Sequence, residues 1–165
     1  MNSTSNTRDL TDILDFTDVL DFGDMLEREL KRFVNKLKKD VEDGLLDDFL
    51  DALLRIMKLT FWLDGDFRKN IKDFDARYTF KSKDKGIAAS AIFKRDKMEV
   101  KRHEIHDTNA TVIFKDNKSL WEFLFSDDLD VFAFVLDNRL SFEGNLNYIL
   151  KFAYMAKHLQ LMFGL

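Results

Sequence analysis

Two stretches near the amino terminus repeat their apolar residues every three or four positions, which is the period of an amphipathic α-helix. The first stretch begins at Met25 and the second follows Gly44. Their apolar positions are Leu26, Leu30, Phe33, Val34, Leu37 and Val41 in the first stretch, and Leu46, Phe49, Leu50, Leu53, Met57 and Phe61 in the second. The pattern predicts an amphipathic helical region over residues 25–62.

From residue 74 the apolar period changes to two, as in a β-strand with one buried face. Phe74, Ala76, Tyr78 and Phe80 alternate with polar residues, which predicts a strand that is solvated on its other side. Turn residues then separate further short segments of the same kind. The strands predicted in this way are residues 74–81, 87–94, 98–103, 110–115 and 140–143.

Helical patterns return after the fourth predicted strand. Ser119 and Glu122 have the spacing of a capping box, which predicts a helix that starts at Ser119. Residues 131–136 are apolar on nearly every side, and residues 146–163 form a longer helical pattern with few charges. We therefore predict an α+β fold: a five-stranded, mainly antiparallel sheet with helices packed on one face, preceded by N-terminal amphipathic helices.

Composition narrows the class of protein. The 165 residues include 17 Phe, 6 Met and no Cys, and their formal net charge is −4. Without Cys there are no disulfides or thiolate metal sites, and a cytoplasmic location is expected. Neither a leader peptide nor a membrane-spanning segment is recognisable. The negative net charge argues against nucleic acid as a partner.

Charge is unevenly distributed along the chain. Residues 1–24 carry six Asp and one Arg within a short repeat, which indicates either a disordered acidic segment or one that docks through Phe16 and Phe22. Residues 81–102 carry eight Lys or Arg and three acids, a composition that suits transient contact with anionic membranes. However, the basic turns at 83–85 and 94–97 belong to opposite ends of a sheet, which favours a solvated surface instead.

The carboxy-terminal hundred residues resemble a known family. The resemblance is carried by Thr111–Phe114, by the helix expected over residues 116–125, and above all by Asn138-Arg-Leu-Ser-Phe-Glu-Gly-Asn145 before a closing apolar helix. These features are similar to the sterol carrier protein type-two family. The resemblance implies a lipid-binding domain over residues 64–165, with a hydrophobic tunnel that in relatives holds sterols, fatty acyl chains, acyl-CoA or phospholipids. Residues 1–62 have no clear counterpart.

The function expected from these features is non-catalytic binding of lipids, with or without their transfer. Phe and Met side chains suit the wall of such a cavity, because they are apolar and pliable. The candidate wall residues are Trp121, Leu124, Phe132, Val135, Leu140, Phe142, Phe152, Met155 and Met162. For each of them, ordinary core packing is the competing interpretation.

The alternative function is that of a protein-interaction module whose cavity is vestigial. In this hypothesis the N-terminal helices pair with a second copy of the chain as a homodimer, because their apolar surface exceeds what one short sheet can cover. In the same hypothesis the acidic segment, residues 1–24, binds a basic partner. Packing of the helices on the sheet of the same chain would account for the same apolar pattern.

No catalytic signature is recognisable. His103, Glu104, His106 and Asp107 are metal-ligand types, but residues three apart on a strand point to opposite faces, unlike the paired histidines of a helical zinc motif. The sequence shows neither a Ser, His and acid arrangement nor a glycine-rich phosphate loop. We therefore predict no enzyme activity, no metal and no cofactor.

Overall fold

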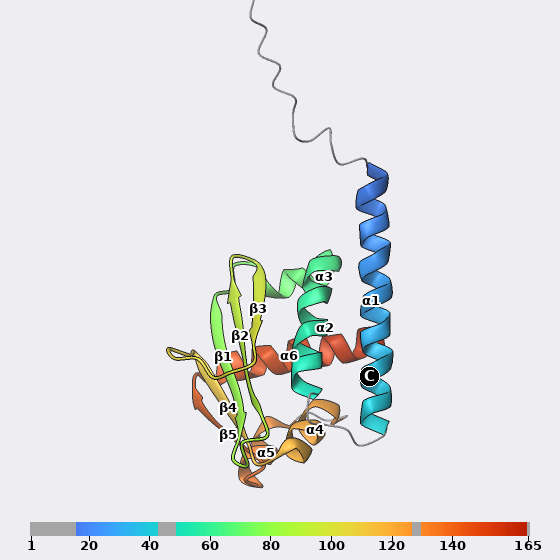
Figure 1. Cartoon of the computed structure of the whole chain (residues 1–165). Helices are drawn as coiled ribbons and strands as arrows, with labels where there is room; N and C mark the ends of the chain where they lie inside the picture. Colours follow the sequence, from blue (N-terminus) through green and yellow to red (C-terminus); the bar gives the residue numbers. More distant parts are fainter. Residues whose placement is uncertain (1–15, 43–48, 127–129, 165) are drawn as a thin grey trace, which may run out of the picture.

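The computed structural model describes residues 16–42, 49–126 and 130–164, so residues 1–15 of the acidic segment lie outside the described part. Helices lie along one side of a five-stranded sheet (Figure 1). The helices are α1 (Phe16–Glu42), α2 (Phe49–Leu63), α3 (Gly65–Arg68), α4 (Asn117–Phe125), α5 (Val131–Leu136) and α6 (Leu146–Phe163), and a 3-10 turn (Lys69–Ile71) follows α3. The strands are β1 (Ala76–Ser82), β2 (Ala88–Lys94), β3 (Lys97–Lys101), β4 (Ala110–Phe114) and β5 (Leu140–Gly144).

The strand order is β3-β2-β1-β4-β5, so β1 is the central strand and β3 and β5 are the two edges. Three neighbouring pairs are antiparallel, and β1 with β4 is the parallel pair. The predicted α+β fold with a mainly antiparallel five-stranded sheet is confirmed. The parallel pair requires a crossover, which residues 102–109 provide between β3 and β4.

Aromatic rings fill the interface between the sheet and α6. Tyr78 and Phe80 of β1 stack with a centroid distance of 6.0 Å, and Phe152 of α6 lies 4.6 Å from the Phe80 ring. The buried Tyr78 hydroxyl donates a hydrogen bond of 2.8 Å to the carbonyl of Tyr148. Burial raises the pKa of this phenol, since the phenolate would lose its hydration. These contacts tie the central strand to α6.

The other face of β1 is solvated at Arg77, as the alternation predicted, but not at Thr79. Thr79 is only 2% exposed, and its hydroxyl lies 3.1 Å from that of the buried Ser90 on β2. The backbone N–H of Ile105 donates to Thr79, and Ser90 donates to the carbonyl of His103. The expectation was wrong at this position because the crossover runs over the back of the sheet and satisfies its hydroxyls.

Helix α2 belongs to the same hydrophobic core as the sheet. It packs against β3 and β2, and four of its apolar side chains have no exposed surface, namely Leu53, Leu54, Ile56 and Met57. Helix α1 lies outside α2, where the buried Leu30, Val34 and Leu37 form its contact face. Figure 1 shows the two helices side by side, with the amino-terminal end of α1 extending beyond α2.

The start of α4 differs from the predicted capping box. Asp116 is the N-cap, and its carboxylate accepts hydrogen bonds of 2.8 Å from the backbone N–H and from the hydroxyl of Ser119. The helix therefore begins at Asn117, and Ser119 lies inside its first turn. Ser119 was the wrong cap because the Asp116 carboxylate, three residues upstream, accepts the N–H of Ser119 and so caps the helix almost one turn earlier.

Candidate functional site

A groove of about 970 Å³ lies between helices α1, α2 and α3 and the turn that joins β2 to β3. Its volume is at the upper end of the range of about 300–1,000 Å³ that is typical of small-molecule sites. We call it the hairpin groove, and its lining residues are Leu26, Lys58, Leu59, Phe61, Trp62, Arg68, Arg95, Asp96, Lys97 and Met98. Half of these residues are apolar and half are charged.

The apolar part of the hairpin groove comes mainly from the last turns of α2. Phe61 is buried against Phe67 and Phe93, with ring centroids 4.5 and 6.1 Å away. The neighbouring Trp62 lines the same groove and is 56% exposed. The groove therefore has a fixed aromatic base and a large exposed aromatic side chain at its margin.

The position of the α2 carboxy terminus is fixed by Arg68. Its guanidinium donates hydrogen bonds to the carbonyls of Phe61 and Trp62, which belong to the last turn of the helix. A cation at the carboxy-terminal end of a helix also interacts favourably with the helix dipole. Arg68 thus holds two groove residues in place while its charge lies at the groove.

The opposite side of the groove is a two-residue hairpin turn. Arg95 and Asp96 have φ angles of +52° and +58°, as a type I′ turn requires at both central positions, although neither residue is glycine. The Asp75 carboxylate accepts from the N–H of Arg95, and the Asp96 carboxylate accepts from the N–H of Asp73. These reciprocal bonds hold the turn against the segment that leads into β1.

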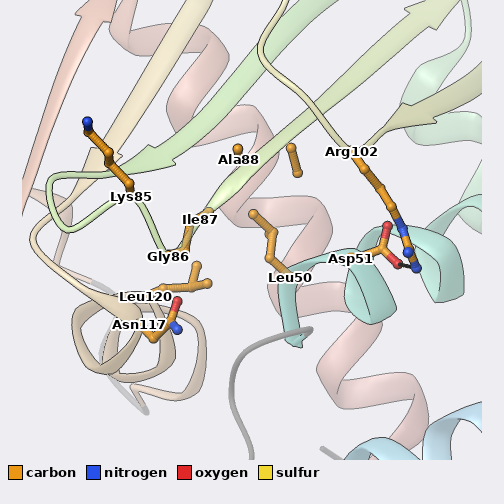
Figure 2. Close-up of a pocket in the computed structure, with 10 residues that line it drawn as sticks. Leu50, Asp51, Lys85, Gly86, Ile87, Ala88, Arg102, Asn117 and Leu120 are labelled. Carbon is orange, nitrogen blue, oxygen red and sulfur yellow. Dashed lines mark hydrogen bonds and ion pairs between the residues drawn. The ribbon is translucent and has the colours of Figure 1, made fainter.

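A second hollow of about 250 Å³ lies between the start of α2, the β1–β2 turn and α4 (Figure 2). Asp51 and Arg102 form an ion pair of 2.7 Å at one side, and Lys85 lies at the other (Figure 2). Burial alone would raise the pKa of Asp51, but hydrogen bonds from Arg102 and Arg55 outweigh it and hold that pKa below its ordinary value. The ion pair between Asp51 and Arg102 connects α2 to the segment that follows β3.

We expect Asp51→Asn to lower the free energy of unfolding at neutral pH by roughly 1–2 kcal/mol, because the ion pairs with Arg55 and Arg102 become hydrogen bonds in which only the arginine is charged. Since the folded pKa of Asp51 is depressed, its contribution is complete above the unfolded pKa and disappears as the pH falls through the folded pKa. Urea unfolding of both proteins between about pH 7 and pH 2 measures this, and the difference should shrink towards acid. A constant difference across that range would contradict this assignment.

The nine predicted wall residues do not line one common hollow among those described. Leu124, Leu140, Phe152 and Met155 are buried in the core, whereas Phe132 is 60% exposed and Met162 is exposed as well. The half-buried members that pack against the core are Trp121, Val135 and Phe142. Trp121 stacks on Phe125 at 3.8 Å and lines a shallower hollow of about 400 Å³ beside α5.

Sequence reasoning missed most of the hairpin groove. The basic turn at 94–97 and the apolar face of α2 were both recognised, but the sequence pattern did not indicate that the two lie next to each other in the fold. The available signal was the pair Phe61-Trp62, where two large aromatic residues end a helix and cannot share one buried face.

Within residues 16–42, 49–126 and 130–164, no three His, Cys, Asp or Glu side chains lie close enough together to hold a metal ion. None of the helices in the same ranges combines the length and apolar character that crossing a bilayer requires.

The described fold belongs to the α+β class, with its helices segregated to one side of the sheet. No protein-family model matches the chain, and no curated protein matches it in sequence. A segment of an inverting sec-alkylsulfatase from a Pseudomonas species is similar in fold, with a TM-score of 0.50 and 11% identity. The match covers 65% of this chain but only 16% of the sulfatase chain.

Two smaller solved structures are similar over most of their length. One is described as the UbiJ-SCP2 ubiquinone synthesis protein, with 16% identity, a TM-score of 0.49, and coverage of 74% of this chain and 97% of that chain. The other is the sterol carrier protein domain 2 of Helicoverpa armigera, with 14% identity, a TM-score of 0.48, and coverage of 69% and 88%. At these identities the likeness concerns the arrangement of helices and strands.

Proposed function

We propose that this protein reversibly binds a lipid-like amphiphile in the hairpin groove and does not alter it chemically. The observation that carries the proposal is the groove itself, in which five apolar side chains from α1, α2 and β3 line a hollow of about 970 Å³. An extended alkyl chain suits such a lining, since it has no polar group that needs a partner. The resemblance of residues 64–165 to the sterol carrier protein type-two family implies the same class of ligand.

The energetics favour binding that is reversible. Burial of one methylene contributes about 0.8 kcal/mol, so a chain of about sixteen carbons that leaves water gains on the order of 10 kcal/mol before ordering costs. A chain that leaves a bilayer instead exchanges one apolar environment for another, and the net difference is small. A groove of this kind can therefore both load and unload lipid.

The two tryptophans distinguish the hairpin groove from the nine residues predicted along the sequence. Trp62 lines the groove, whereas Trp121 is one of the nine and lies beside α5. Trp121→Phe leaves Trp62 as the only tryptophan, and Trp62→Phe leaves only Trp121. We expect a fatty acid, and the fatty alcohol of the same length, to shift the emission of the Trp121→Phe protein to shorter wavelength and to leave the Trp62→Phe protein unchanged.

The opposite pattern would move the ligand to the site defined by Trp121, Val135, Phe142 and the other predicted wall residues. If neither variant responds, and calorimetry of the unmodified protein detects no binding of either lipid at micromolar concentrations, lipid binding is excluded as the function.

The interaction-module hypothesis stays a prediction. Part of the apolar face that suggested a homodimer is covered in this chain, because Leu30, Val34 and Leu37 of α1 are buried next to α2. Met25 and Phe33 of the same helix remain exposed. Contact of the basic segment with membranes is likewise untested.

A further inference from the structure

The hairpin groove carries a strong local positive charge in a chain whose net charge is −4. Its four basic residues come from three separate elements: Lys58 from α2, Arg68 from α3, and Arg95 and Lys97 from the β2–β3 hairpin. Among the described residues that line the groove, Asp96 is the one acid. Like charges repel, so an anion that binds among these four cations would relieve their mutual repulsion.

The described part of the chain supplies little of this compensation. Within it, Lys58, Arg95 and Lys97 form no salt bridge. Arg68 donates only to backbone carbonyls, and the Asp96 carboxylate already accepts the N–H of Asp73. Three cationic side chains are therefore available to an anion at the margin of an apolar hollow.

The arrangement matches the two parts of a single-chain anionic lipid. Leu26, Leu59 and Met98 provide apolar surface for the alkyl chain, and the cations stand where its head would reach solvent. A carboxylate and a phosphate share this chemistry, since each is an anion that accepts hydrogen bonds from Lys and Arg. The backbone of the turn that carries these hairpin cations is held in place, because Asp75 accepts the N–H of Arg95.

We propose that the ligand of the hairpin groove is a monomeric single-chain lipid with an anionic head group, held by Lys58, Arg95 and Lys97. This inference rests on the proposed function, because it names the class of lipid that the same groove binds. It adds selectivity, which an apolar lining alone does not provide.

The test compares three amphiphiles with the same alkyl chain, namely dodecanoate, dodecanol and dodecyltrimethylammonium. Calorimetry at low salt, well above the pKa of a carboxylic acid, should show that dodecanoate binds about tenfold more tightly than dodecanol, with the cation weakest. Added salt should reduce this preference, because the cations are exposed. Equal binding of all three would overturn the head-group inference and leave the groove intact as a lipid site, whereas binding of none would overturn both.

A matched pair of charge reversals locates the head group. Lys58→Glu with Lys97→Glu should weaken the binding of dodecanoate far more than that of dodecanol, so that the preference for dodecanoate disappears. Lys83→Glu with Lys85→Glu changes the net charge equally at the β1–β2 turn, which is the opposite end of β2, and should leave the preference unchanged. Loss of the preference in the control pair alone would overturn the assignment to this groove. Binding to phosphatidylglycerol vesicles without any binding of monomeric dodecanoate would also overturn it, in favour of a membrane surface.

Discussion

Replacement of Leu53 by alanine is expected to lower the free energy of unfolding by about 2–5 kcal/mol, because it removes a fully buried side chain from a packed core. Leu53 has no exposed surface and lies in α2 among residues that contact the sheet. Urea denaturation followed by circular dichroism measures the change. Such a loss would establish that α2 is part of the domain, even though residues 1–62 have no counterpart in the family resemblance.

Leu59→Ala is the matched control, since it makes the same chemical change in the same helix at a half-buried groove position. We expect it to cost only about 1 kcal/mol, in proportion to the smaller area that it removes from a buried environment. A loss below about 1 kcal/mol for Leu53→Ala would instead show α2 to be an appendage. In that case the hairpin groove would lack a rigid wall.

Gly144→Ala is the second substitution with a large expected effect, a loss of about 2–4 kcal/mol. Gly144 ends β5 with a φ of +96°, and an added Cβ would lie 2.3 Å from the carbonyl oxygen of Asn109. The substitution therefore combines an unfavourable backbone conformation with a clash against main chain that cannot turn away. Unfolding in urea should show the loss as a lower midpoint with an unchanged slope.

Gly65→Ala provides the comparison for this effect. Gly65 begins α3, and a Cβ added there meets nothing within 4 Å. The free energy of unfolding of the Gly65→Ala protein should stay within about 0.5 kcal/mol of the parent value or rise slightly, as expected for an alanine in a helix. If Gly144→Ala behaved like Gly65→Ala, the close approach of β5 to Asn109 would be refuted.

The sequence predicted the strands well because apolar alternation has a physical cause that acts within each segment. Tyr78 and Phe80 had to face the same way, and they do. The pairing of the strands was not predictable in this way, since the alternation of β1 carries no information on whether β4 runs parallel or antiparallel to it. The burial of Thr79 could not be predicted for the same reason, because it depends on the crossover that the parallel pair requires.

Helix ends were less predictable than helix faces. Asp116 and Ser119 are both good caps, and which one begins α4 is decided by a difference of about 1 kcal/mol or less. Beyond the signal of the Phe61-Trp62 pair, the hairpin groove was not predictable, for another reason. Leu26, Trp62 and Lys97 come from three elements far apart along the chain, and a periodic pattern shows which face is apolar without showing which gap remains open after packing.

The outermost strands also bear on how copies of this chain behave beside one another. Strand β3 ends the sheet on one side, and its outward positions carry Lys97, Glu99 and Lys101, two of which form an ion pair of 3.6 Å. Charged side chains along a terminal strand discourage it from accepting a strand of another molecule. The β3 margin of the sheet is thereby protected against edge-to-edge aggregation.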